Sequence, residues 1–148
     1  LLIKNKKTVS VAESCTGGLL SKFLTELSGS SQYFILGIVA YSNKAKVKFL
    51  SIPVSLIAAK GAVSREVAKR MAQSVRKLAK TDFGIGITGI AGPTGGTSQK
   101  PVGSVFIAVD SVNKKLCKKF FFLGRRATIR KKAALKSLEL LNESIYCH

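Results

Sequence analysis

Two side chains that could act as nucleophiles follow one another in the segment AESCTGG, residues 12–18. The apolar and β-branched run TVSVA before them predicts a strand, so Ser14 and Cys15 stand between a strand end and a helix start. The backbone amides of Cys15, Thr16 and Gly17 could there stabilise an oxyanion or hold a phosphate. Two alternatives stay open: Ser14 or Thr16 only caps the helix, and Cys15 is a buried, inert thiol.

Any serine or cysteine here needs a base, and the sequence offers none of the usual kind. Its one histidine, His148, stands at the chain end, which argues against Ser-His-Asp, Cys-His and histidine-rich zinc sites. Lys46 is a candidate base, because a lysine that is desolvated near cations such as Lys44 and Lys48 loses its proton more readily. The alternative is that KAKVK forms a solvated basic face and that Tyr41 before it only packs.

Two further segments could bind an anion. The loop of residues 89–103, dense in Gly, Pro and Ser, is long enough to suggest a function, and its amides could cradle an anion. It matches neither a Walker A motif nor the Rossmann fingerprint. In GRRATIR, Arg126 and Arg130 stand one helical turn apart, a spacing at which two guanidiniums can share a phosphate. Ordinary turn chemistry and exposed arginines are the alternatives for these segments.

The chain, residues 1–148, has the length and composition of a single globular domain. With 46% hydrophobic and 22% charged residues, it can bury a sizeable core. Its apolar runs are shorter than the roughly 20 residues of a membrane span, and its start lacks the order of a signal peptide. Three cysteines without C-x-x-C spacing favour free thiols in a reducing compartment. We therefore expect a cytoplasmic protein without a membrane partner, and the initial Leu leaves room for a longer chain.

The charge is lopsided, with 25 Lys and Arg against 7 Asp and Glu, a net charge of +18. Such a balance suggests nucleic acid or anionic ligands as partners. The cations are scattered from Lys4 to Lys136, and the aromatic residues form no basic-aromatic recognition motif. We therefore favour solvated lysines over nucleic-acid binding, and a small anionic substrate fits both interpretations.

Apolar periodicity predicts an α/β order. We expect strands over residues 8–12, 33–41, 83–88, 104–109 and 115–123, the last two as a hairpin. Expected helices start at a Thr16 cap with Leu27 inward, at an Asn43 cap, at residue 53, at Ser64 with a core stripe of Val67, Met71, Val75 and Leu78, and near Thr128. The order predicts a three-layer α/β/α domain with a mixed sheet of about five strands. ESCTGG, YSNKAK and TGIAGPTGG follow strand ends, so they can converge on one pocket.

Taken together, the chain resembles the C-terminal domain of the competence/damage-inducible protein CinA, a family that includes nicotinamide-nucleotide amidases. The matching segments, in order, are AESCTGG, GSS, YSNKAKVKFL, GAVS, TGIAGPTGG, KPVGSV and GRRATIR. The resemblance implies an amidohydrolase that converts nicotinamide mononucleotide to nicotinate mononucleotide and ammonia. It implies no metal and no other cofactor, and it suggests a homodimer.

The resemblance also implies roles for individual residues. Ser14 falls on the family's nucleophile and Lys46 on its base. The lysine is assigned by the family pattern Tyr-Ser-Asn-x-x-Lys, in which x is any residue, and this pattern selects Lys46 over Lys44. Tyr41 falls on the matching tyrosine and would help to relay the proton. The implied substrate-binding positions are Cys15, Thr16, Gly17, Ser31, Thr88, Gly89, Gly92, Arg126 and Arg130. In one departure, Arg125 stands where the family typically has Asp, an acid able to orient an arginine.

Two other functions stay open at this point. One is a non-catalytic nucleotide-binding or regulatory domain of a CinA-like protein, and the intact set of Ser14, Tyr41 and Lys46 argues against it. The other is a basic nucleic-acid-binding domain, which would show an affinity that falls steeply with salt.

Overall fold

The computed structural model describes residues 1–146, so Cys147 and His148 lie outside the described residues. Five strands form one mixed sheet in the order β2-β1-β3-β4-β5. They are β1 (Val9–Glu13), β2 (Phe34–Val39), β3 (Phe83–Gly89), β4 (Ser104–Ser111) and β5 (Lys115–Phe121). The first three run parallel to one another, and β4 and β5 continue the sheet as an antiparallel hairpin. This confirms the predicted mixed sheet of five strands.

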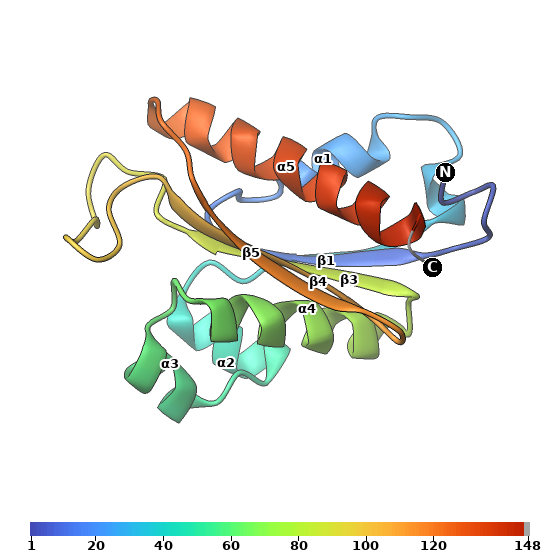
Figure 1. Cartoon of the computed structure of the whole chain (residues 1–148). Coiled ribbons are helices and arrows are strands. Elements are labelled where there is room, and N and C mark those ends of the chain that lie inside the picture. The colour runs from blue at the N-terminus through green and yellow to red at the C-terminus, as the bar shows by residue number, and fades with distance from the viewer. Residues whose placement is uncertain (147–148) are drawn as a thin grey trace.

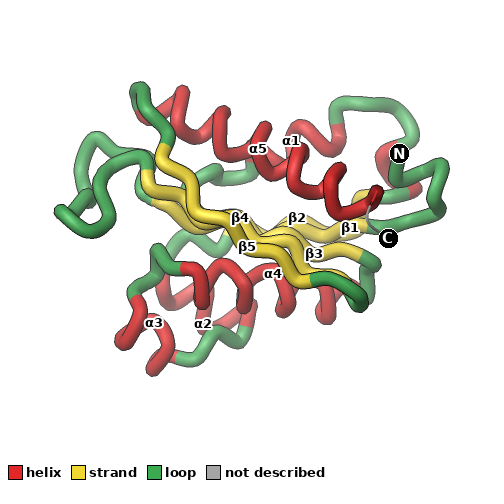
Figure 2. Tube along the Cα trace, viewed as in Figure 1, coloured by secondary structure: helices red, strands yellow, loops and turns green. Residues whose placement is uncertain are grey.

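Helices cover both faces of the sheet, as Figures 1 and 2 show. One face carries α1 (Leu19–Thr25) and α5 (Arg126–Tyr146), and the other carries α2 (Asn43–Leu50), α3 (Val54–Lys60) and α4 (Arg65–Ala79). A short 3-10 helix, η1 (Ser30–Gln32), precedes β2. The three-layer α/β/α architecture is therefore confirmed. Among residues 1–146, no helix combines the length and the apolar character that crossing a bilayer would require.

The centre of the sheet is buried because helices pack on both of its faces. Every residue of β1 and β4 is buried, whereas exposed and half-buried residues alternate along the edge strand β2. Two glycines of β3 let α4 lie directly on the sheet. A Cβ atom on Gly84 would be 2.2 Å from the carbonyl oxygen of Ala72, and one on Gly86 would be 2.3 Å from that of Ala68. The strand and helix are therefore held at a separation that only glycine permits.

Two apolar residues predicted to face the core are exposed. Leu27 is 72% exposed because α1 ends at Thr25, before the periodicity reaches it. Leu78 is 59% exposed because the buried stripe of α4, which includes Ala68 and Ala72, continues toward Ala79 instead.

Two helix caps also differ from the prediction. Ser42, and not Asn43, caps α2 by accepting a hydrogen bond from the amide of Ala45. Thr16 does not cap α1. The residue at the cap position is Gly18, which has no side chain to accept a hydrogen bond. The predicted helix start at Ser64 is confirmed: α4 begins at Arg65, and the Ser64 hydroxyl caps it by accepting a hydrogen bond from the amide of Val67.

Candidate active site

The carboxyl ends of three parallel strands meet at one edge of the sheet and bring the predicted segments together. Ser14 follows β1 directly, Tyr41 comes two residues after β2, and Gly89 ends β3. A cavity of about 270 Å³ lies there. Its walls include the predicted residues Ser14, Cys15, Tyr41, Lys46, Thr88, Gly89, Gly92 and Arg126. The predicted convergence on one pocket therefore holds for these eight residues.

Ser14 and Lys46 form a buried pair among the residues that line this cavity. The Lys46 Nζ atom lies 3.0 Å from the Ser14 Oγ atom and donates at 3.1 Å to the carbonyl oxygen of Tyr41. The two side chains belong to residues that are only 2% and 7% exposed. Lys46 reaches inward because it lies one turn into α2, whose start is fixed by the Ser42 cap. The pair has the separation that a nucleophile and its general base require.

Burial shifts the pKa values of Lys46 and Cys15 in opposite directions. It lowers the pKa of the Lys46 ammonium from its ordinary value of 10.5, so a larger fraction of Lys46 is the neutral amine at a given pH. Burial raises the pKa of the Cys15 thiol to about 11, although Lys46 and Arg130 nearby favour the thiolate. A thiol with that pKa is neutral near pH 7, so the environment favours Ser14 over Cys15 as the nucleophile.

A buried carboxylate that the sequence analysis did not single out anchors the turn after Ser14. Glu13 is fully buried, and its two oxygens accept hydrogen bonds from the amides of Leu20 and Ser21 and from the Ser21 hydroxyl. It thereby satisfies donors at the start of α1, the role that had been assigned to Thr16. A signal was present in the sequence, because Glu13 is the one charged residue of the buried strand VSVAE.

The turn also limits which amides can serve an oxyanion. The Gly17 amide donates to the Ser14 carbonyl oxygen at 3.0 Å, so it is occupied within the turn. Gly17 itself packs against Arg130, whose Nη2 would lie 2.9 Å from a Cβ at that position. Gly17 and Thr16 are not among the residues that line the cavity, and Cys15 is. Of the three residues whose amides were predicted to hold an oxyanion, only Cys15 lines the cavity.

The two arginines of GRRATIR have separate partners, although they stand one turn apart on α5. Arg126 donates to the carbonyl oxygen of Gly92 at 2.7 Å and to the Tyr41 hydroxyl at 2.9 Å, across the cavity rim. Arg130 donates to the carbonyl oxygens of Cys15 and Thr16, in the turn after Ser14, and does not line the cavity. The structure does not bring the two guanidiniums together in a shared phosphate site.

Two other predicted residues take different positions. Thr88 is buried at the cavity wall, and its hydroxyl donates to the Ala62 carbonyl oxygen at 2.8 Å. Ser31 lies in η1, which precedes β2, so it sits at the opposite end of the parallel strands from Ser14. It is exposed and does not line the cavity of this single chain. The expected homodimer stays a prediction, and so does the role of Ser31.

Several residues that line the cavity were not predicted to be part of the site. They are Asn43, Ala62, Val63, Ile90, Ala91, Thr94 and Gly95. Most belong to segments already singled out, GAVS and TGIAGPTGG, so the segments were found although the individual positions were not. Asn43 was expected to cap α2, but Ser42 forms that cap and Asn43 lines the cavity.

The fold and the site define a three-layer α/β domain with a buried serine–lysine pair at the carboxyl ends of its parallel strands. A family model described as CinA C-terminal domain matches residues 1–145, and the chain belongs to that family. A competence-damage inducible protein of Thermoanaerobacter pseudethanolicus is 50% identical over 95% of this chain and 34% of its own length. A CinA-like protein of Geotalea daltonii is 45% identical over 98% of this chain and 35% of its own. The chain thus spans about a third of the length of these curated relatives.

Solved structures agree with this assignment. The competence/damage inducible protein CihA from Agrobacterium tumefaciens superposes with a TM-score of 0.94 at 38% identity, covering 96% of this chain and 87% of the other. A CinA superfamily protein from Klebsiella pneumoniae gives a TM-score of 0.95 at 28% identity, covering 99% and 92%.

Proposed function

We propose that this domain is an amidohydrolase that converts nicotinamide mononucleotide to nicotinate mononucleotide and ammonia. The observation that carries the proposal is the 3.0 Å contact between the Ser14 Oγ and Lys46 Nζ atoms in a buried pair. A desolvated lysine with a lowered pKa can act as a base where no histidine lines the cavity among the described residues. The membership of the CinA family supports the choice of substrate, through the resemblance set out above.

The proposed reaction passes through an acyl-enzyme. The Ser14 Oγ atom attacks the carboxamide carbon while neutral Lys46 takes the hydroxyl proton. The carbon–nitrogen bond then breaks, and Lys46 returns that proton to the leaving nitrogen, which departs as ammonia. Lys46 then takes a proton from water, and the resulting hydroxide attacks the ester carbon. The bond from that carbon to the Ser14 Oγ atom breaks, which releases the nicotinate carboxyl, and Lys46 returns the proton to Oγ. The amide of Cys15 is the proposed donor to the oxyanion.

The phosphate end of the substrate is assigned to the cavity rim. The cavity, about 270 Å³, is slightly smaller than the roughly 300–1,000 Å³ of typical ligand sites, so we place only the pyridine carboxamide deep within it. Arg126 is exposed at the rim. Its guanidinium could exchange its hydrogen bonds to the Gly92 carbonyl oxygen and the Tyr41 hydroxyl for hydrogen bonds to a phosphate. Thr88, Gly89 and Gly92 would then border the ribose. Arg130 is excluded from this role because it donates to the turn after Ser14 and does not line the cavity.

Tyr41 was expected to relay a proton through its hydroxyl, and we propose that its backbone carbonyl acts as well. Its carbonyl oxygen, and not its hydroxyl, contacts Lys46, while the hydroxyl accepts from Arg126. We therefore propose that the Tyr41 backbone orients the Lys46 amine, and that the phenol joins the proton relay only after substrate displaces Arg126. A cytoplasmic location is part of the proposal, in line with Cys15 and Cys117 being free thiols among the described residues.

The test is ammonia release by the purified chain from three related amides. These are nicotinamide mononucleotide, nicotinamide riboside and free nicotinamide. We expect hydrolysis of the mononucleotide, a higher KM without the phosphate, and an Arg126→Ala variant that raises KM for the mononucleotide about tenfold or more. Lys132→Ala, on an exposed α5 position away from the rim, is the matched control and should leave KM unchanged. Absence of ammonia with all three amides would leave a nucleotide-binding domain without amidase activity as the better description.

A further inference from the structure

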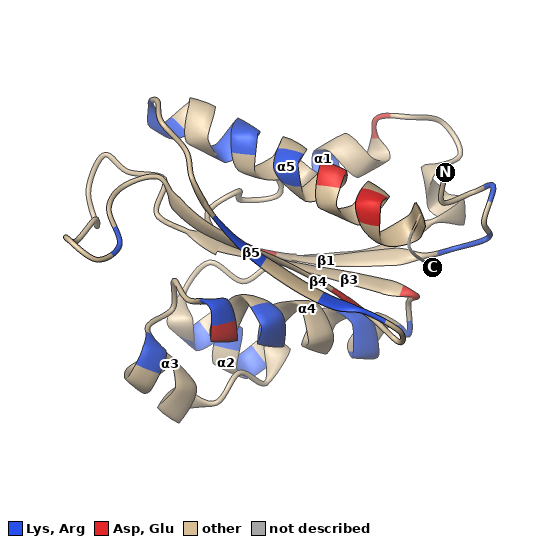
Figure 3. Cartoon of the chain, in the orientation of Figure 1, with Lys and Arg blue, Asp and Glu red and all other residues tan. Residues whose placement is uncertain are grey.

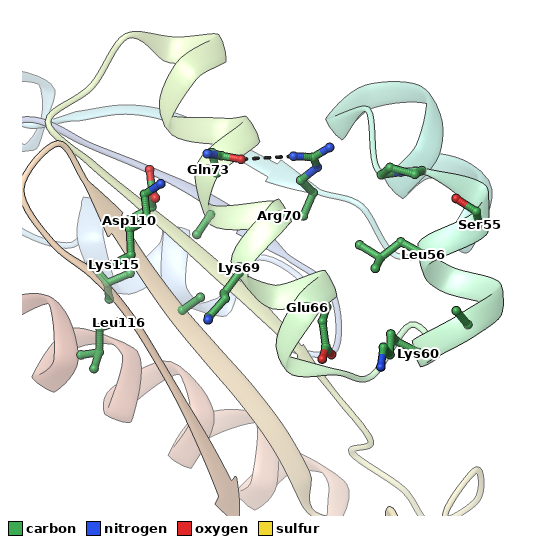
Figure 4. Close-up of a pocket in the computed structure, with 15 residues that line it drawn as sticks. Ser55, Leu56, Lys60, Glu66, Lys69, Arg70, Gln73, Asp110, Lys115 and Leu116 are labelled. Carbon is green, nitrogen blue, oxygen red and sulfur yellow. Dashed lines mark hydrogen bonds between the residues drawn. The ribbon is translucent and has the colours of Figure 1, made fainter.

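A second hollow, of about 630 Å³, lies on the outer face of α4, with α3 on one side and the β4–β5 hairpin on the other (Figure 4). It shares no lining residue with the cavity around Ser14. We call it the α4 groove and define it by Lys60, Glu66, Lys69, Arg70 and Lys115 at its edges and Leu56 on its α3 wall.

The α4 groove is positively charged. Lys60 comes from α3, Lys69 and Arg70 from α4, and Lys115 from β5. Among the described residues, no ion pair uses any of these four cations. Arg70 has only a long contact, 3.4 Å, from its Nη1 atom to the Gln73 amide oxygen, drawn in Figure 4.

Its carboxylates do not offset this charge. Asp110 is nearly buried and forms an ion pair with Arg76, so its charge is already matched. Glu66 is the one groove carboxylate without a cation partner among the described residues. Four unpaired cations against one unpaired carboxylate leave a groove complementary to an acidic ligand.

The spacing of the cations along the groove favours an elongated ligand over a compact one. The four charged groups stand on three different elements and do not converge on one point (Figure 4). A single phosphate could reach only part of such a set, whereas carboxylates spaced along a peptide can each meet one cation. Pro53, Leu56 and Ala59 give the α3 side an aliphatic surface beside Ser55 and Lys60, and among residues 1–146 no aromatic side chain lines the groove. That composition suits aliphatic side chains and gives nucleic-acid bases no surface on which to stack.

We propose that the α4 groove binds an acidic amphipathic segment of a partner protein. Carboxylates of that segment pair with Lys60, Lys69, Arg70 and Lys115, and its aliphatic side chains pack on Leu56 and its neighbours. This is the helix-in-groove mode, in which apolar contacts supply affinity and charge supplies selection. The site is independent of Ser14 and Lys46, so it stands or falls separately from the amidase proposal.

The experiment uses a fluorescent synthetic peptide of about four helical turns that repeats Glu and Leu with helical spacing. Fluorescence anisotropy measures its binding to the full chain, to Lys69→Glu/Arg70→Glu and to Lys131→Glu/Lys132→Glu. The second pair is equally exposed and adjacent but lies on α5, in the opposite layer, so both variants change net charge equally. A second peptide with Ser in place of Leu tests the apolar contribution.

We expect the groove pair to weaken binding about tenfold or more, because reversed charges would repel the peptide, and the α5 pair to leave it nearly unchanged. The peptide without Leu should bind more weakly, and Ser14→Ala should bind the original peptide as the parent does. Equal weakening by both charge pairs would reduce the binding to general attraction and overturn the proposal. So would absence of binding, or a groove-dependent preference for adenosine monophosphate or single-stranded DNA over the peptide.

Discussion

At the scale of single residues, the central feature is a lysine held out of water beside a serine. Lys46 is 2% exposed and has Ser14 and the Tyr41 carbonyl as its polar neighbours. No carboxylate forms an ion pair with it among residues 1–146. Burial without a counter-charge is what favours the neutral amine, the form that can accept a proton.

The pH dependence of the reaction follows from this environment. Only neutral Lys46 can act as the base, so kcat/KM should rise with pH through the lysine's pKa and level off above it. Because desolvation lowers that pKa, the rise should be centred below the ordinary value of 10.5. A pH profile of ammonia release measures it. A profile that is flat throughout, or that rises only at the ordinary lysine value, would contradict the role of Lys46.

Glu13 offers a second prediction at this scale. Replacing it by Ala leaves three hydrogen-bond donors at the start of α1 without their acceptor, so we expect a loss of about 1–3 kcal/mol in unfolding free energy. Catalysis should fall as well, because the same residue precedes Ser14. Urea unfolding and ammonia release measure the two effects. Glu26→Ala, which removes an exposed carboxylate of the α1 C-cap, is the control, and equal stability of the two variants would refute the anchoring role.

At the scale of elements, α4 and the sheet depend on glycine. A methyl group at Gly86 would lie 2.3 Å from the Ala68 carbonyl oxygen and 2.6 Å from the Ala72 amide nitrogen, both backbone atoms that cannot move independently of the helix. The helix must therefore shift if any side chain is added. The loop before α4 contributes Ala62 and Val63 to the active-site cavity, so such a shift would reach the site.

We accordingly expect Gly86→Ala to lower the unfolding free energy by about 1–3 kcal/mol or more, the usual cost of overpacking. Ile85→Val, its neighbour on β3, only removes a methyl group from the opposite face and should cost about 0.5–1.5 kcal/mol. Denaturant unfolding compares the two variants. A Gly86→Ala protein as stable as the parent would mean that α4 is not fixed by this contact.

The elements also show how far the sequence alone could lead. Short apolar runs between Gly and polar segments predicted all five strands, and because parallel strand ends meet, three motifs could be assigned to one pocket. Leu27 is exposed because α1 ends at Thr25, and Leu78 is exposed because the buried stripe of α4 includes Ala68 and Ala72. Neither the helix end nor the exact position of the stripe follows from apolar periodicity alone. Arg126 and Arg130 share a helical spacing, but only the tertiary fold decides which carbonyl oxygens each one meets. The hydrogen-bond partners of Glu13 could not be predicted from the sequence, because they depend on where α1 begins relative to β1.

At the scale of the whole molecule, positive charge is spread over both helical layers and β5, as Figure 3 shows. With 25 cations and 7 carboxylates in the sequence, the five ion pairs of the described residues leave most cations unpaired. Such a distribution attracts polyanions without selecting among them.

Binding to duplex DNA should therefore be weak, indifferent to sequence and unchanged in Ser14→Ala. Raising salt from about 50 to 200 mM should lower the affinity about a thousandfold if six or more phosphates are contacted. Anisotropy titrations with two unrelated duplexes measure it. Sequence-dependent binding that survives at the higher salt would favour the nucleic-acid function that was left open above.

The most direct measurement is the rate of ammonia release from nicotinamide mononucleotide by the parent chain, Ser14→Ala, Lys46→Ala and Lys44→Ala, each checked for folding by circular dichroism. We predict at least about a thousandfold loss for Ser14→Ala and about a hundred- to ten-thousandfold loss for Lys46→Ala. Lys44→Ala, an exposed neighbour on α2, should retain the parent rate. An active parent whose Ser14→Ala or Lys46→Ala variant keeps that rate would contradict a serine–lysine amidase.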